Sequence, residues 1–125
     1  DKHPAMMALV QAADYTLEIE DANAAAKMIA AIPAFLEQTS ILAMRRTKSG
    51  MKETDIRPLL VSLSGDATAI HAVMALTETL ACKPDMLLSA LSTFCGLENA
   101  PDALIIRNGL LGRDENGELT PLENL

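Results

Sequence analysis

The sequence contains few aromatic residues. Tyr15, Phe35 and Phe94 are the three present, and tryptophan is absent. Platforms that stack the bases of single-stranded nucleic acid depend on aromatic side chains, so this composition argues against such a platform. A core must therefore be built from Leu, Ile, Met and Ala. With 50% hydrophobic and 22% charged residues, the chain still has the composition of a soluble folded domain rather than a disordered one.

Long apolar runs and cysteine clusters are missing as well. No run approaches the roughly 18 apolar residues that a membrane-spanning helix needs. Cys82 and Cys95 stand alone, without the additional ligands that a zinc or iron–sulfur site requires. A chain of 125 residues can bury a core without disulfide staples. We therefore expect reduced thiols in a cytoplasmic protein, with Cys95 filling space in a buried helix.

Motifs for catalysis are also absent from the sequence. Gly109 and Gly112 lack the lysine and the following helix of a nucleotide-binding loop, and they predict a turn. His3 and His71 are isolated, and His71 is expected to face solvent from a strand. No nucleophile and base stand together in a recognisable pattern. We expect no catalytic residues, no metal and no cofactor. An enzyme would require acidic residues and His71 to converge in one pocket.

Positive charge is scarce overall but concentrated in one place. Ten Lys and Arg against 17 Asp and Glu give a net charge of −7, which disfavours general binding to phosphate backbones. The stretch Arg45–Arg57, called the basic segment below, carries +3, so the rest of the chain carries −10. Its cations are the candidate contact residues for a partner or for RNA: Arg45, Arg46, Lys48, Lys52 and Arg57.

Three interpretations of the basic segment remain open. It is a solvated hairpin with local ion pairs to Glu53 and Asp55, a docking surface for an acidic partner domain, or a phosphate-contacting patch for RNA. Arginine suits both carboxylate and phosphate, so residue type does not separate the last two. Because strand side chains alternate between faces, Arg45 and Arg46 are not expected to serve one site together.

Hydrophobic periodicity predicts a mixed fold. Alternation with period two predicts strands, and spacing of three to four predicts helices. The expected strands cover 9–20, 40–47, 69–80 and 103–111, and the expected helices cover 22–37 and 84–95. Residues 59–63 fit either a strand or a helical turn, and 119–125 form a polar tail with room for one short edge strand.

Local signals refine these elements. Asp21 is the expected N-cap of the first helix, and Pro33 is expected to kink or end it. Thr47–Gly50 has the composition of a turn, so Lys48 and Lys52 are expected to flank a loop. The order of elements predicts an α+β fold, a single domain over 1–125 of the ferredoxin-like, split βαβ sandwich type. An antiparallel sheet would carry two helices on one face.

Several stretches together resemble a known family. They are 1–10 with Ala12–Tyr15, then Lys52–Leu59 with Asp-Ile-Arg-Pro at 55–58, Lys83–Leu88 and Arg107–Leu111. They are similar to the C-terminal half of the radical SAM-linked domain of unknown function, the DUF2344 family. Members of that family occur alone or fused behind cobalamin-binding radical SAM enzymes, often encoded near ribonuclease E/G and ribosomal proteins.

The resemblance implies a non-catalytic accessory or substrate-presenting module for a radical SAM enzyme, in RNA or ribosome-linked modification. The alternatives are an RNA-binding module acting alone and a structural protein-interaction domain. The family has no established catalytic residues, and the CxxxCxxC motif of radical SAM clusters is absent here. Because the sequence starts at Asp1 without an initiator Met, we expect a fragment. The expected partners are the enzyme or the missing N-terminal half, which would pack on exposed apolar sheet surface.

Overall fold

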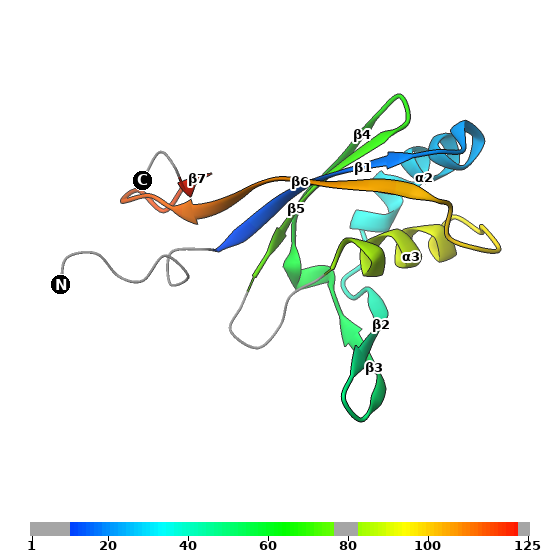
Figure 1. Cartoon of the computed structure of the whole chain (residues 1–125), viewed down its shortest axis with the longest axis horizontal. Coiled ribbons are helices and arrows are strands. Elements are labelled where there is room, and N and C mark those ends of the chain that lie inside the picture. The colour runs from blue at the N-terminus through cyan, green and yellow to red at the C-terminus, as the bar shows by residue number, and fades with distance from the viewer. Residues whose placement is uncertain (1–10, 77–82, 123–125) are drawn as a thin grey trace.

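A computed structural model of the chain describes residues 11–76 and 83–122 (Figure 1). The described part contains two α-helices, a single 3-10 turn and two antiparallel sheets. In chain order, the elements are β1 (Ala12–Ile19), α2 (Ala22–Leu36), β2 (Leu42–Thr47), β3 (Gly50–Asp55), η1 (Arg57–Leu59), β4 (Leu60–Asp66), β5 (Ala69–Ala75), α3 (Pro84–Phe94), β6 (Ala103–Arg113) and β7 (Leu119–Pro121).

The main sheet has five strands in the order β4-β5-β1-β6-β7. All neighbours in it are antiparallel, and β5 lies between β1 and β4, which are the strands of this sheet that precede and follow α2 in the chain. The predicted α+β class is confirmed. The fifth strand β7 and the separate β2–β3 sheet are additions to a four-stranded split βαβ unit, so the finer ferredoxin-like assignment stays a prediction.

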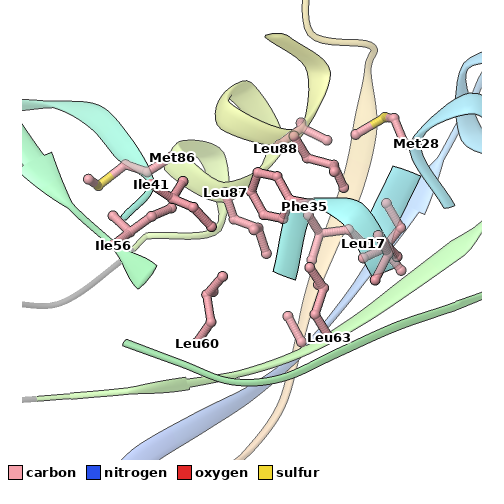
Figure 2. Packing of buried hydrophobic residues seen from close by; sticks show 14 of the residues in the cluster. Leu17, Met28, Phe35, Ile41, Ile56, Leu60, Leu63, Met86, Leu87 and Leu88 are labelled. Atoms are coloured by element: carbon pink, nitrogen blue, oxygen red, sulfur yellow. The ribbon is translucent and has the colours of Figure 1, made fainter. Parts of the chain in front are cut away.

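Both helices cover one face of the main sheet. Asp21 caps α2 as predicted, because its carboxylate accepts hydrogen bonds from the backbone of Asn23 and Ala24. Met28 and Phe35 from α2 are buried in one cluster with Leu87 of α3 and Leu17 of β1. Figure 2 shows Phe35 beside Leu87 and Leu88, above Leu63 of β4. The core is thus built from aliphatic residues, methionine and one aromatic ring.

The closest approach between α2 and the sheet occurs at Gly65 of β4. A Cβ atom placed on Gly65 would lie 2.5 Å from Cγ1 of Ile29. Ile29 is β-branched and stiff in a helix, so it has little freedom to move aside. Glycine at this position lets α2 rest directly on the backbone of β4.

The hairpin formed by β2 and β3 leaves the main sheet and projects away from it (Figure 1). Its turn at 48–49 and the positive φ of 131° at Gly50 agree with the predicted turn. The expectation that Lys52 flanks a loop is wrong, because Lys52 lies inside β3. Residues 50–55 are exposed or half-exposed and show no buried alternation, so period-two reasoning could not find this strand.

Other boundaries mostly follow the predictions. Helix α2 runs through Pro33 to Leu36, which agrees with the predicted range 22–37, so Pro33 does not end the helix. Residues 59–63 supply both of the expected alternatives, because a 3-10 turn ends at Leu59 and β4 follows. The short strand predicted in the tail is present as β7. Residues 9–10 and 77–80 of the predicted strands lie outside the described residues.

The end of α3 is less buried than expected. Phe94 is exposed over 41% of its surface, although its ring meets Phe35 edge-on at 5.4 Å. Cys95 is only half-buried, just beyond the last residue of α3, and is a free thiol. Cys95 packs against the core cluster, as expected of a residue that fills space there, but its expected place at a buried helix position is wrong. Over 11–76 and 83–122, neither helix combines the length and hydropathy that crossing a membrane would demand.

Candidate interaction site at the basic hairpin

The base of the β2–β3 hairpin is closed by Asp55. One carboxylate oxygen of Asp55 accepts hydrogen bonds from the backbone N–H of Ile41 at 2.9 Å and of Arg57 at 3.0 Å. The backbone N–H of Ile56 donates to the carbonyl oxygen of Ile41 at 2.7 Å. These backbone bonds, with smaller contributions from Ser40 and the Arg57 charge, lower the pKa of Asp55 below its usual range. Asp55 therefore acts as a structural anion.

Arg57 ties the same base to the end of α2. Its Nε donates to the carbonyl of Gln38 at 3.2 Å, and one terminal nitrogen donates to the carbonyl of Leu36, also at 3.2 Å. The other terminal nitrogen reaches the carbonyl of Leu60 at 3.5 Å. The last carbonyls of a helix have no partner within the helix, and a cation there satisfies them. Arg57 is thus occupied within the fold, although the sequence placed it among the contact residues.

The tip of the hairpin carries the other cations. Arg45 lies directly opposite Lys52 in the β2–β3 pairing, and Lys48 lies in the turn. Arg46 lies opposite Met51, so the predicted separation of Arg45 and Arg46 onto opposite strand faces holds for the register. Lys48 and Lys52 are exposed, and Arg45 is half-exposed. We call Arg45, Lys48 and Lys52 the tip cations.

The tip cations form no ion pair with any residue that the structure describes. The sequence suggested that Asp55 forms an ion pair with a nearby cation of the hairpin. Its carboxylate instead accepts hydrogen bonds from backbone N–H groups. Like charges directly opposite each other in a hairpin are destabilising, and Arg45 and Lys52 are such a pair. An external anion that approaches both side chains would relieve this repulsion.

An apolar groove runs between the hairpin and α3. We call it the methionine groove, with a volume of about 440 Å³. Its wall includes six large or apolar side chains from the two sides: Leu42, Met44, Met51, Met86, Ala90 and Phe94. Leu42, Met44 and Met51 are each more than half exposed. Figure 2 shows Met86 beside Ile41 and Ile56, which fix the hairpin base against α3.

The groove and the tip cations are adjacent. A neighbouring hollow of about 450 Å³ shares Met44, Met51 and Met86 with the methionine groove and also reaches Arg45. In the register of the hairpin, Met44 and Met51 lie diagonally on one face, whereas Arg45 and Lys52 share the other. A ligand that extended from the methionine groove into this second hollow would therefore meet apolar side chains first and then Arg45, together with Lys83 and Asp85, which also line that hollow.

His71 belongs to a polar network on the open face of the main sheet. Its Nδ1 lies 3.3 Å from the hydroxyl of Thr16, which accepts a hydrogen bond from the Asn108 side chain at 2.8 Å. Asn108 also donates to the carboxylate of Asp14 at 3.3 Å. His71 is exposed, as predicted. Asp14 and Asn108 also line a hollow of about 250 Å³ near β7, which His71 and Thr16 do not join.

Among residues 11–76 and 83–122, no three His, Cys, Asp or Glu side chains are grouped as a metal would need. Gly109 and Gly112 lie inside β6, so the predicted turn at these residues is wrong. Gly109 pairs with β1 at Asp14, next to a register shift, and Gly112 pairs with Thr120 of β7. His3 and Cys82 lie outside the described residues.

Comparison with protein families identifies the chain. A family model described as "Uncharacterized protein conserved in bacteria (DUF2344)" matches residues 1–89. The chain belongs to this family. Neither the curated proteins nor the solved structures contain a match. The family assignment agrees with the resemblance found in the sequence, whereas the association with radical SAM enzymes rests on that resemblance alone.

The matched region covers the hairpin and its base and ends within α3. The Asp-Ile-Arg-Pro stretch at 55–58 lies inside it and forms the hairpin base described above. The stretch Arg107–Leu111 lies beyond the match. The sequence analysis missed the methionine groove, because a strand predicted over 40–47 does not indicate that its apolar residues Leu42 and Met44 stay exposed. A hairpin with its turn at Thr47–Gly50 brings Met44 near Met51, so the predicted turn could have indicated this pair of methionines.

Proposed function

We propose that this chain is a non-catalytic accessory module that docks on a radical SAM enzyme, in RNA or ribosome-linked modification, through the basic hairpin. The resemblance supplies the partner. The observation that supports docking is the joint presence of tip cations and an exposed methionine groove on a hairpin that leaves the sheet. The partner surface would offer acidic side chains around an apolar segment that enters the groove.

The character of the groove favours a protein partner over RNA. Phosphate contacts require cations, and the tip cations meet that requirement equally well for RNA. Leu42, Met44 and Met51, however, add apolar surface that a phosphate backbone does not use. Methionine is flexible and polarizable, and it is common on surfaces that bind other proteins. The hairpin itself carries no aromatic side chain on which a base could stack.

The position of the hairpin fits a docking role. Its base is fixed by Asp55 and Arg57, so the tip is held at a defined place relative to α3. A rigid base lowers the entropy lost when a partner binds. The tip is positive on a chain of net charge −7. An acidic partner surface is therefore attracted to the hairpin and repelled by the rest of the chain, which orients the partner as it approaches.

A pull-down with the chain as bait tests the proposal. We expect a radical SAM enzyme to co-purify and to resist RNase treatment. Lys48→Ala with Lys52→Ala should weaken its binding at least about tenfold, which corresponds to about 1.4 kcal/mol. The matched control replaces two exposed cations outside the hairpin, Lys27→Ala with Arg113→Ala, and should bind as the unmodified chain does.

A second pair of substitutions separates the two classes of partner. Met44→Ser with Met51→Ser leaves the charge unchanged and should weaken a protein partner strongly but RNA little. Loss of binding after RNase, or binding that depends on the lysines and not on the methionines, would support the RNA-binding alternative. Binding of the enzyme that is unaffected by both pairs of substitutions would contradict docking through the hairpin.

A further inference from the structure

Strand β6 is the least covered part of the main sheet. Leu104 is exposed over 64% of its surface, Ile106 over 42% and Ile105 over 38%. In the pairing with β1, Leu104 and Ile106 lie on the open face, whereas Ile105 lies on the face that carries the helices. Helix α2 packs on β1 and β4, but neither helix has a comparable contact with β6. Both faces of this strand therefore expose large aliphatic side chains.

One edge of β6 is also open. Its other edge pairs with β1, and β7 pairs only with Leu111–Arg113. The backbone N–H of Glu20 donates to the carbonyl of Asp102, which directs that residue's backbone toward β1. Because antiparallel ladders alternate, the N–H and C=O groups of Ala103, Ile105 and Arg107 point to the open edge. No backbone group in the described ranges pairs with them there.

The opposite edge of the sheet is protected. Strand β4 has 7 residues against 11 in β6, and its pairing with β5 is interrupted between Leu60 and Ser62. Ser62, Ser64 and Asp66 make its open-face positions polar. Short, interrupted and polar edge strands resist pairing with other chains, whereas a long aliphatic edge is a template for it. We therefore expect the β6 edge, and not the β4 edge, to pair with another chain.

The sequence of β6 is complementary to itself in antiparallel pairing. With a twofold axis at Ile105, Ile105 of one copy faces Ile105 of the other, and Leu104 faces Ile106 on the open side. Arg107 then lies opposite Ala103 rather than opposite another Arg107. The outward backbone groups of Ala103, Ile105 and Arg107 would bond reciprocally in this register.

We propose that β6 is the interface of a symmetric dimer, in which two copies of this chain pair edge to edge and continue the sheet. Such an interface is self-complementary, as a twofold dimer requires. The aliphatic side chains of both copies would cover one another on each face of the seam. This interface is separate from the basic hairpin.

Sedimentation over a concentration series tests the proposal. The chain of 13.3 kDa should sediment with twice that mass, and Leu104→Lys with Ile106→Lys should shift it to the monomer. The two substitutions bring lysines opposite each other across the seam, at positions where exposed side chains leave the fold intact. The matched control, Val61→Lys on the β4 edge, replaces a residue exposed over 47% and should stay dimeric.

Hydrogen exchange gives a second measurement that does not depend on the substitutions. In the dimer the amides of Ile105 and Arg107 should be protected, and dilution should remove that protection. The amide of Ile106 points toward β1, so it should stay protected in both states. A chain that is monomeric at every concentration would overturn the proposal. The proposal would also be overturned if a segment of a longer protein occupied the open edge of β6. Equal dissociation by Val61→Lys would also overturn it.

The test is independent of the proposed docking on an enzyme. Binding through the tip cations should weaken as salt is added, because surface charges are screened. Two copies of a chain with net charge −7 repel each other, so added salt should leave the β6 dimer unchanged or strengthen it. Loss of one interaction without the other would therefore identify which of the two proposals fails.

Discussion

The base and the tip of the β2–β3 hairpin contain the same kinds of charged residue and use them differently. At the base, Asp55 and Arg57 are engaged with backbone groups of Leu36 in α2, of Ile41 just before β2 and of Leu60 in β4. At the tip, Arg45, Lys48 and Lys52 have no such partners among the described residues, and two of them face each other. The basic segment therefore contains a structural junction at its base and, at its tip, the cations that we propose as a contact surface.

This difference shows where substitutions should affect folding and where they should affect binding. A charged group that satisfies helix-end carbonyls contributes to stability, because its removal leaves those carbonyls without a donor. A charged group surrounded by water contributes little to stability and remains available to a partner. The following predictions test this division, from the largest expected effect on stability to the smallest.

Arg57→Ala should lower the free energy of unfolding by about 2–3 kcal/mol, because the carbonyls of Leu36, Gln38 and Leu60 lose their donor. Urea denaturation measures this change. Arg57→Lys keeps the charge but offers a single ammonium in place of the guanidinium fork, so it should recover only part of the loss. If Arg57→Ala leaves the free energy of unfolding unchanged, Arg57 contributes no more to the stability of the fold than the tip cations do.

Gly65→Ala should lower the free energy of unfolding by about 1–2 kcal/mol, because the new methyl group meets Ile29 where α2 rests on β4. Thermal unfolding measures the loss. Partner binding at the hairpin should remain intact at temperatures where the variant is folded. In the Ile29→Ala background, which removes the atoms that the new methyl group meets, Gly65→Ala should cost little or no stability. An undiminished loss in that background would show that contact with Ile29 is not the cause.

Acid should weaken the base through Asp55. The folded pKa of Asp55 is lowered by its backbone hydrogen bonds, so the carboxylate stabilises the fold fully above the unfolded value of about 3.9. That contribution is lost as the pH falls from there through the lowered folded value. Asp55→Asn should be less stable than the unmodified chain at neutral pH, and the two should converge in strong acid. A constant difference in urea denaturation across this pH range would contradict the role given to Asp55.

Lys52→Glu should have the smallest effect on stability and the opposite sign. It replaces the repulsion between Lys52 and Arg45 with attraction, which should stabilise the hairpin by about 0.2–1 kcal/mol. The same substitution should weaken an acidic partner, so stability and binding would move in opposite directions. Lys27→Glu on α2 is the control, and it should change neither strongly. Destabilisation by Lys52→Glu would indicate that the tip cations also support the fold.

Much of the fold was accessible from local sequence patterns. The alternation around Leu17 and Ile19 predicted β1, and Asp21 with the spacing of Met28 and Ile32 predicted α2. Pro84 correctly marked the start of α3. These signals succeed because each element buries one face on the same core, which imposes a period of two or 3.6 on its apolar residues. Strand β3 buries no such face, so its sequence carried no period.

The sequence by itself determined the α+β class, the cluster of cations between Arg45 and Arg57 and the family to which the chain belongs. Only the tertiary structure separated Arg57 from the tip cations, because two of its carbonyl partners, Leu36 and Gln38, lie 21 and 19 residues away along the chain. The tertiary structure likewise decided that Leu104 and Ile106 stay exposed. Apolar residues in a strand predict burial, but whether a face is covered depends on where the helices pack, and they leave β6 uncovered.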